Sequence, residues 1–174
     1  SLNKFRQIRH EARRVGARTL IETGTYLGVT TRRCARVFDR VLTIELDEKL
    51  ARQASRYLAD LPHVEVVQGD AVRRLPELLS RADVESVFQF LDAHFSSGDT
   101  ACGDEPEPAL LEQEIIAQHI GKLRGFIIDD FRSFGLEPGF PKKSELLSAC
   151  ERLFPGFELR VHLDQVIVAA APGK

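Results

Sequence analysis

The sequence predicts an α/β fold: one doubly wound, Rossmann-like domain that spans residues 1–174. Three observations lead to this prediction. The hydrophobic period changes five times from strand-like to helical, the strand-like runs are short and apolar, and the last two runs are separated only by a turn near Asp164. Because so short a connection holds no helical crossover, those two strands must be antiparallel. The pattern predicts a mostly parallel seven-stranded sheet with helices on both faces and a C-terminal antiparallel hairpin.

The individual elements follow from these periods in chain order. An N-terminal helix is expected over residues 1–17, because Phe5, Ile8, Ala12 and Val15 recur at helical spacing before Gly16. The expected parallel strands are 19–21, 41–44, 64–67, 87–91 and 126–128, and the hairpin strands are 157–163 and 165–170. Helices are expected at 28–38, 50–58, 72–79, 111–123 and 146–154. The segments 96–108 and 131–143 are expected to be loops.

Composition narrows the classes of function. With 43% hydrophobic residues and a formal net charge of −2, the chain has no general attraction for phosphate backbones or anionic lipids, so we expect neither a nucleic acid nor a membrane as partner. The cysteines Cys34, Cys102 and Cys150 are far apart and odd in number, which predicts two buried thiols and one loop thiol instead of a disulfide framework. A reducing cytoplasm is therefore the expected location.

Every predicted parallel strand ends in acid. The residues concerned are Glu22, Glu45, Asp70, Asp92 and the pair Asp129–Asp130. The carboxyl ends of parallel strands meet at one edge of the sheet, and ligands bind there near the point where the strand order reverses. Carboxylates gathered at one crevice repel each other. We therefore expect the crevice to hold an occupant that is cationic or that donates hydrogen bonds.

The glycine-rich turn after the first strand excludes two common ligands. A dinucleotide-binding turn needs G-x-G-x-x-G, but Tyr26 stands where its second glycine would be, counting from Gly24. A phosphate-binding P-loop is excluded because no G-K-[ST] follows. Glu22, directly before the turn, would repel a phosphate. The expected ligand is therefore nucleoside-like, without phosphate, and positively charged.

The segments at the strand ends form a series along the chain: IETGTYLGVT (21–30), TIELD (43–47), QGDA (68–71), LDAH (91–94) and IDD (128–130). In this order and spacing they resemble the motifs of class I S-adenosylmethionine-dependent methyltransferases, and most of all the small metal-dependent O-methyltransferases of the caffeoyl-coenzyme A and catechol type. The resemblance covers about Thr19 to Asp130 and also implies the terminal hairpin. It implies a Rossmann-like methyltransferase domain.

The resemblance implies S-adenosylmethionine as the cofactor and assigns residues to its parts. Gly24 and Gly28 let the backbone approach the methionine part, Glu45 accepts hydrogen bonds from the ribose hydroxyls, and Asp70 binds the adenine amine. The cofactor-binding residues expected in this way are Glu22, Gly24, Thr25, Tyr26, Gly28, Glu45, Asp70, Ala71 and Asp92.

The resemblance also implies Mg²⁺ or another divalent metal, with Asp92, Asp129 and Asp130 as its oxygen ligands. The family commonly has Asn at the position of Asp130, and adjacent Asp129 and Asp130 can both bind one ion only if their strand has already ended. Catechol-type members have a lysine base three residues after the fourth-strand aspartate, where this chain has Phe95. His94 and Asp92 are therefore the expected catalytic residues, with His94 as base or as a nitrogen ligand.

These residues together predict transfer of a methyl group from S-adenosylmethionine to a hydroxyl oxygen of a small-molecule acceptor, assisted by a divalent metal. The loops 96–108 and 131–143 flank the strand ends and are expected to form the acceptor side. A second copy of the chain, in a homodimer, would be able to cover the crevice. Two alternatives stay open: a metal-independent methyltransferase with His94 as base, and a non-catalytic module that binds S-adenosylmethionine.

Overall fold

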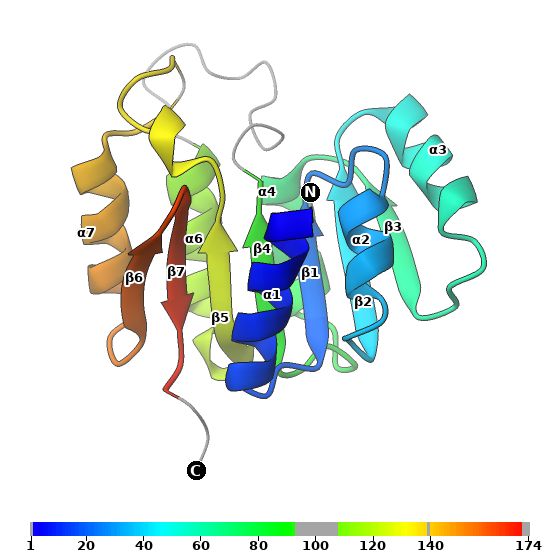
Figure 1. The fold of residues 1–174 in the computed structure, drawn as a ribbon, viewed down its shortest axis with the longest axis horizontal. Coiled ribbons are helices and arrows are strands. Elements are labelled where there is room, and N and C mark those ends of the chain that lie inside the picture. The colour runs from blue at the N-terminus through cyan, green and yellow to red at the C-terminus, as the bar shows by residue number, and fades with distance from the viewer. Residues whose placement is uncertain (1, 93–107, 139, 172–174) are drawn as a thin grey trace.

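One twisted sheet forms the centre of the molecule (Figure 1). The computed structural model describes residues 2–92, 108–138 and 140–171. The strands are β1 (Thr19–Thr23), β2 (Arg40–Glu45), β3 (Val64–Gln68), β4 (Val87–Leu91), β5 (Leu123–Ile128), β6 (Glu158–His162) and β7 (Gln165–Ala169). Their order in the seven-stranded sheet is β3-β2-β1-β4-β5-β7-β6. The pairs from β3 to β5 are parallel, and β7 is antiparallel to both β5 and β6.

Helices cover both faces of this sheet. They are α1 (Leu2–Arg14), α2 (Val29–Cys34), α3 (Glu48–Tyr57), α4 (Ala71–Leu79), α6 (Pro108–Gln118) and α7 (Lys143–Leu153), with short 3-10 turns η1 (Ile120–Lys122) and η2 (Phe131–Ser133). In Figure 1, α1 and α2 lie in front of the sheet, and α4 and α6 lie behind it. Helix α2, which follows β1, therefore lies on the opposite face from α4 and α6, which follow β3 and β4, as in the doubly wound arrangement.

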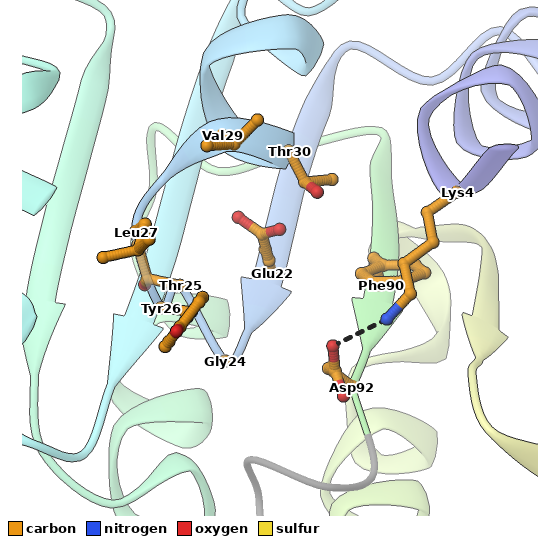
Figure 2. A pocket seen from close by; sticks show the side chains of 10 residues that line it. All are labelled: Lys4, Glu22, Gly24, Thr25, Tyr26, Leu27, Val29, Thr30, Phe90 and Asp92. Carbon is orange, nitrogen blue, oxygen red and sulfur yellow. Dashed lines mark hydrogen bonds and ion pairs between the residues drawn. The ribbon is translucent and has the colours of Figure 1, made fainter. Parts of the chain in front are cut away.

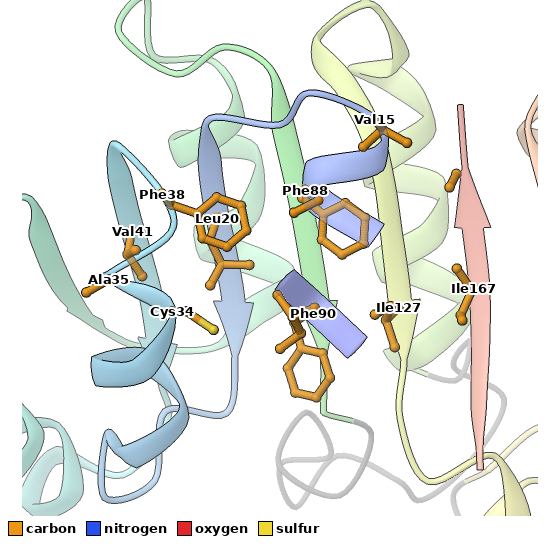
Figure 3. Packing of buried hydrophobic residues seen from close by; sticks show 13 residues of the cluster. Val15, Leu20, Cys34, Ala35, Phe38, Val41, Phe88, Phe90, Ile127 and Ile167 are labelled. Atoms are coloured by element: carbon orange, nitrogen blue, oxygen red, sulfur yellow. The ribbon is translucent and has the colours of Figure 1, made fainter. Parts of the chain in front are cut away.

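The alternation of side chains along β4 divides the core between the two faces. Phe88 and Phe90 are buried on the face that α1 covers (Figure 3). They belong to one core cluster with Ile8 of α1 and with Val15, which follows α1. Val87 and Leu91 point to the other face, where they join the apolar residues of α4, α6 and α7. Because both faces of the central strands are covered, the strands contain almost continuous apolar runs.

The predicted fold class is confirmed, including the mostly parallel seven-stranded sheet and the antiparallel C-terminal hairpin. Cys34 and Cys150 are buried as predicted, whereas Cys102 lies outside the described residues. Helix α2 is shorter than predicted, because after Cys34 the backbone tightens into turns in which Val37 N–H bonds to the Cys34 carbonyl. This brings Phe38 into the core just before β2 begins. None of the helices in the described ranges is long and apolar enough to cross a membrane.

The strand order reverses between β1 and β4, which are neighbours although two other strands lie between them in the chain. Their carboxyl ends carry Glu22 and Asp92. At such a reversal the following segments leave toward opposite faces, so a crevice opens between them. This position is where the predicted site residues meet.

Gln89 provides a test of the packing behind the sheet. Its side chain is fully buried in the middle of β4, and within the described parts of the chain neither amide atom has a hydrogen-bond partner. A buried polar group without a partner costs free energy. We expect Gln89→Leu to raise the free energy of unfolding by about 1 kcal/mol, measured by urea denaturation.

Gln113 in α6 is the matched control for Gln89. It is equally buried, but its amide donates to the Ala109 carbonyl and accepts from the Cys150 thiol. Gln113→Leu is therefore expected to lower stability by about 1–2 kcal/mol. An equal loss of stability in both variants would mean that Gln89 is satisfied in solution.

Candidate functional site

The turn between β1 and α2 needs left-handed backbone at several positions. Gly24, Tyr26 and Gly28 have φ values of +85°, +50° and +73°. The N–H groups of Gly24 and Thr25 bond to the Ile44 carbonyl, so the turn is attached to β2. At Gly28 a Cβ atom would lie 3.1 Å from Leu58 Cδ1, so this glycine is required both by φ and by close packing.

Glu45, at the end of β2, holds this turn through its carboxylate. One oxygen accepts from the Tyr26 N–H at 2.7 Å and the other accepts from the Asp47 N–H at 3.0 Å. The first bond stabilises Tyr26 in a backbone conformation that side chains rarely adopt. Glu45 is buried, so its charge lies close to the turn and to the start of α3.

Glu22 is buried beneath the same turn and is bound by hydroxyl groups. The hydroxyl groups of Thr31 and Thr43 donate to the same oxygen of Glu22, at 2.5 and 2.9 Å. The Thr25 hydroxyl lies 2.6 Å from the Thr43 hydroxyl. Burial raises the pKa of Glu22 to about 7, against the lowering effect of the two hydroxyl donors. The carboxyl group therefore changes its charge close to neutral pH.

Asp70 and Ala71 lie at the start of α4, after β3. The Asp70 carboxylate accepts from the Val72 N–H at 2.8 Å and caps the helix. Ala71 is buried against the α4 face of the sheet. Neither residue lines the cavity that lies between the glycine turn and β4 and that contains Glu22. They lie at the end of β3, which is separated from β1 by β2.

A cavity of about 280 Å³ opens between the glycine turn and β4 (Figure 2). Its lining comes from the turn, from the start of α2, from β4 and from α1: Lys4, Glu22, Gly24, Thr25, Tyr26, Leu27, Val29, Thr30, Phe90 and Asp92. The structure therefore brings five of the predicted cofactor residues to one cavity, namely Glu22, Gly24, Thr25, Tyr26 and Asp92. Gly28 lies at the end of the same turn, and Glu45 reaches the turn through Tyr26.

Three carboxylates meet beside this cavity. One oxygen each from Asp92, Asp129 and Asp130 lie within 4.8 Å of one another. Strand β5 ends at Ile128 and Asp130 has a left-handed backbone (φ +55°), so the adjacent Asp129 and Asp130 both reach the cluster. Burial raises the pKa of Asp92, and the charges of Asp129 and Asp130 add to this effect, whereas Lys4 opposes it.

Lys4 is a charged residue of the cavity that the sequence pattern does not predict. Its ammonium group reaches from α1 past the Phe90 ring and bonds to Asp92 at 3.1 Å and to Asp129 at 2.5 Å (Figure 2 shows the first pair). Burial lowers the pKa of Lys4, but the two carboxylates outweigh this effect and raise it overall. Asp129 accepts a further hydrogen bond from the Gln165 amide at 2.8 Å.

The carboxylate cluster alone is of a suitable size for a divalent cation. Two oxygens on one Mg²⁺ are at most about 4.2 Å apart, and two on one Ca²⁺ at most about 5 Å. With Lys4 bound to Oδ2 of Asp92 and of Asp129, however, the set does not fit such an ion, because the dication would lie beside the ammonium group and the two positive charges would repel each other.

Several predicted residues lie outside the described part of the chain. These are His94, Phe95 and nearly all of the segment 96–108. The segment 131–143 is less of an open loop than predicted. It begins with η2, and the fully buried Phe134 contacts Phe131 and Phe140 in an aromatic cluster under α7. This cluster belongs to the core and does not line the cavity.

The comparisons with known proteins concern the fold. No protein-family model matches this sequence, and no curated protein is similar to it. Among solved structures, the O-methyltransferase from Bacillus cereus in complex with S-adenosylhomocysteine is similar with a TM-score of 0.72, at 20% identity over 97% of this chain and 81% of that one. TomG from Streptomyces achromogenes, an O-methyltransferase involved in tomaymycin synthesis and solved with S-adenosylmethionine, has a TM-score of 0.69 at 19% identity, over 99% and 81%.

A third similar structure is the methyltransferase domain of a bacterial Hen1 protein. It has a TM-score of 0.63 at 11% identity, and the match covers 97% of this chain and all of that one. At these levels of identity the likeness shows the fold. The chain therefore has the fold of class I S-adenosylmethionine-dependent methyltransferases.

Glu22 gives a prediction about pH and stability. Its pKa is about 7 in the folded protein, above the ordinary 4.5, so the folded state keeps the proton to higher pH than the unfolded state. The free energy of unfolding therefore falls as pH rises from about 4.5 to 7, by up to about 3 kcal/mol from this group. Glu22→Gln should remove this fall, so relative to wild type the variant gains stability between pH 5 and pH 8 in urea denaturation.

Glu151 on α7 is the control for this experiment, because its side chain is exposed. Glu151→Gln is expected to follow the wild-type pH profile. If Glu22→Gln also follows that profile, the buried carboxyl group does not titrate between those pH values and the argument from burial is wrong.

Proposed function

We propose that this chain is an S-adenosylmethionine-dependent methyltransferase that transfers a methyl group to a hydroxyl oxygen of a small-molecule acceptor. One observation carries the proposal: a cavity lies between a tight glycine turn and β4, with the buried carboxylates Glu22 and Asp92 in its lining. Its position at the strand-order reversal is the ligand site of this fold. The similar structures solved with S-adenosylmethionine or its product support the same cofactor.

The chemistry of the cavity suits a cationic ligand. A sulfonium or ammonium group would be attracted by Glu22 and Asp92, and the absence of a Cβ atom at Gly24 lets the methionine part approach the turn closely. Glu45 would accept hydrogen bonds from the ribose hydroxyls with its charged oxygens, and Asp70 and Ala71 would lie toward the adenine ring.

The reaction itself needs positioning and one proton acceptor. The acceptor oxygen forms a bond to the methyl carbon as the sulfur–methyl bond breaks in line, which leaves S-adenosylhomocysteine and a methylated oxygen. The hydroxyl proton must go to a base. Asp92 is suited to this, because burial raises its pKa and makes it a stronger base than an exposed aspartate. His94, two residues later, is the second candidate for this base.

Assistance by a divalent metal stays a prediction from the sequence. The convergence of Asp92, Asp129 and Asp130 supports it. The contacts of Lys4 with Asp92 and Asp129 oppose it, because they place a positive charge against two of the three carboxylates that would hold the metal. We therefore derive no catalytic step from a metal.

The acceptor would enter beside Asp92, between the segments 96–108 and 131–143, which follow β4 and β5. We propose a small molecule as the acceptor and a homodimer as the assembly that covers the crevice. Both are extensions of the sequence prediction.

Calorimetric titration with S-adenosylmethionine and S-adenosylhomocysteine tests the cofactor, and an assay of oxygen and nitrogen acceptors with the bound cofactor tests the reaction. We expect saturable binding of both compounds and turnover on a hydroxyl acceptor. Binding with turnover that depends on His94 instead of Asp92 would favour the alternative base. Binding without turnover on any acceptor would favour a non-catalytic module, and absence of binding would contradict the proposal.

Glu45 offers a variant with a matched control. Glu45→Gln keeps the shape but removes the charge that binds the Tyr26 N–H and would bind the ribose. We expect S-adenosylhomocysteine to bind about tenfold more weakly or worse to this variant in calorimetry. Glu48→Gln, an exposed position three residues later, should bind as wild type does. Equal affinities of wild type and Glu45→Gln would exclude Glu45 from the cofactor site.

A further inference from the structure

The carboxylate cluster already contains a cation that belongs to the chain. The Lys4 ammonium bonds to Asp92 at 3.1 Å and to Asp129 at 2.5 Å, and the Lys4 side chain is 28% exposed whereas the two carboxylates are 8% and 6% exposed. A surface ion pair contributes little, but these acceptors are buried and the lysine bridges both. Removing the ammonium would leave two buried carboxylates facing each other.

The position of Lys4 follows from the docking of α1. Ile8 and Ala12 are buried against the sheet, and Lys4 lies one helical turn before Ile8, on the same face of the helix. A charged residue at the end of the buried face of α1 can reach solvent or a polar partner only if its side chain extends past the edge of the contact between helix and sheet. Lys4 extends along Phe90, with its ammonium 5.8 Å from the ring centre, and ends at the carboxyl end of β4.

Lys4 also lines the cavity together with Glu22 and Asp92. The ammonium group therefore lies where the reacting groups would meet in the proposed function. An ammonium group has three N–H donors; Lys4 donates one of them to Asp92 and forms an ion pair with Asp129. Because Lys4 lines the cavity, an N–H that these two carboxylates do not use can donate to an oxygen atom of a ligand there.

We propose that Lys4 is the resident cation of this site: it takes the place between Asp92 and Asp129 that a divalent metal would need, and its remaining N–H stabilises the acceptor oxygen as that oxygen loses its proton. This inference rests on the proposed function, because it assigns Lys4 to the acceptor side of that cavity. Its consequence is a methyltransferase whose activating cation comes from its own N-terminal helix and which needs no metal ion.

Binding of Mn²⁺ tests the inference without any measurement of activity. Free Mn²⁺ is followed by electron paramagnetic resonance as each protein is added, in three proteins: wild type, Lys4→Met and Lys49→Met. Lys49 is an exposed lysine on α3 and serves as the control. We expect wild type and Lys49→Met to bind Mn²⁺ no more tightly than about 1 mM, and Lys4→Met to bind about tenfold more tightly or better. The added affinity should disappear in Lys4→Met/Asp129→Asn.

Two results would overturn the inference. The first is tight Mn²⁺ binding by wild type that Asp129→Asn removes, because the metal would then displace Lys4. The second is equally weak binding by wild type and by a folded Lys4→Met protein, because Lys4 would then not be what keeps the metal out. Circular dichroism checks the fold of each variant. If Lys4→Met does not fold, the wild-type titration with and without Asp129→Asn still decides.

Failure of the inference is distinguishable from failure of the proposed function. Titration of the same proteins with S-adenosylhomocysteine reports on the cofactor cavity and needs no metal. Wild type that binds neither S-adenosylhomocysteine nor Mn²⁺ contradicts the proposed function. Wild type that binds both, with Mn²⁺ lost in Asp129→Asn, contradicts only the assignment of Lys4.

Discussion

Burial of several carboxylates at one edge of a sheet is the constraint on which this structure depends. Such groups repel one another and lose their hydration, so each needs donors or a cation. Glu45 receives backbone N–H groups of the adjacent turns, and Glu22 receives threonine hydroxyls. Asp92 and Asp129 receive the Lys4 ammonium. Glu45 and Glu22 are therefore stabilised by neutral hydrogen-bond donors, whereas Asp92 and Asp129 are stabilised by a positively charged group.

These partners tie the edge of the sheet to the elements around it. Glu45 connects β2 to the glycine turn, and the hydroxyls around Glu22 connect β1 to α2 and β2. Lys4 connects α1 to the ends of β4 and β5. A ligand that enters the cavity therefore meets a wall held from several sides. This preorganised wall holds the carboxyl groups of Glu22 and Asp92 beside the Lys4 ammonium, so a ligand meets charged groups that are already fixed in place.

Much of this arrangement could be predicted from the sequence, because it depends on local patterns. Short apolar runs predict the parallel strands, and the short connection at Asp164 predicts the hairpin. The acids are found where these predicted strands end. The same acids predict an occupant of the crevice that is cationic or donates hydrogen bonds, but they do not predict a cation from the chain itself. Lys4 is one of many charged residues in its helix and is 88 residues away from Asp92, so no local pattern connects the two. Only the packing of α1 on the sheet brings them together.

The positions of the aromatic residues in segment 131–143 also could not be predicted from local sequence patterns. Phe134 and Phe140 are apolar residues in a Gly- and Pro-rich segment, a pattern that does not distinguish the lining of a pocket from a small core. The structure places Phe134 in the core beside Phe140 because η2 turns the chain back over β5 and α7. The direction of a side chain in an irregular segment depends on contacts distant in sequence.

The most direct measurement is a crystal structure of the chain with S-adenosylhomocysteine, grown in Mn²⁺ and recorded at a wavelength where manganese scatters anomalously. We expect the homocysteine part to lie between the glycine turn and Phe90, with the Lys4 ammonium between Asp92 and Asp129 and no manganese peak at those carboxylates. A manganese peak on Asp92, Asp129 and Asp130, with Lys4 turned away from them, would contradict the view that the chain supplies its own cation.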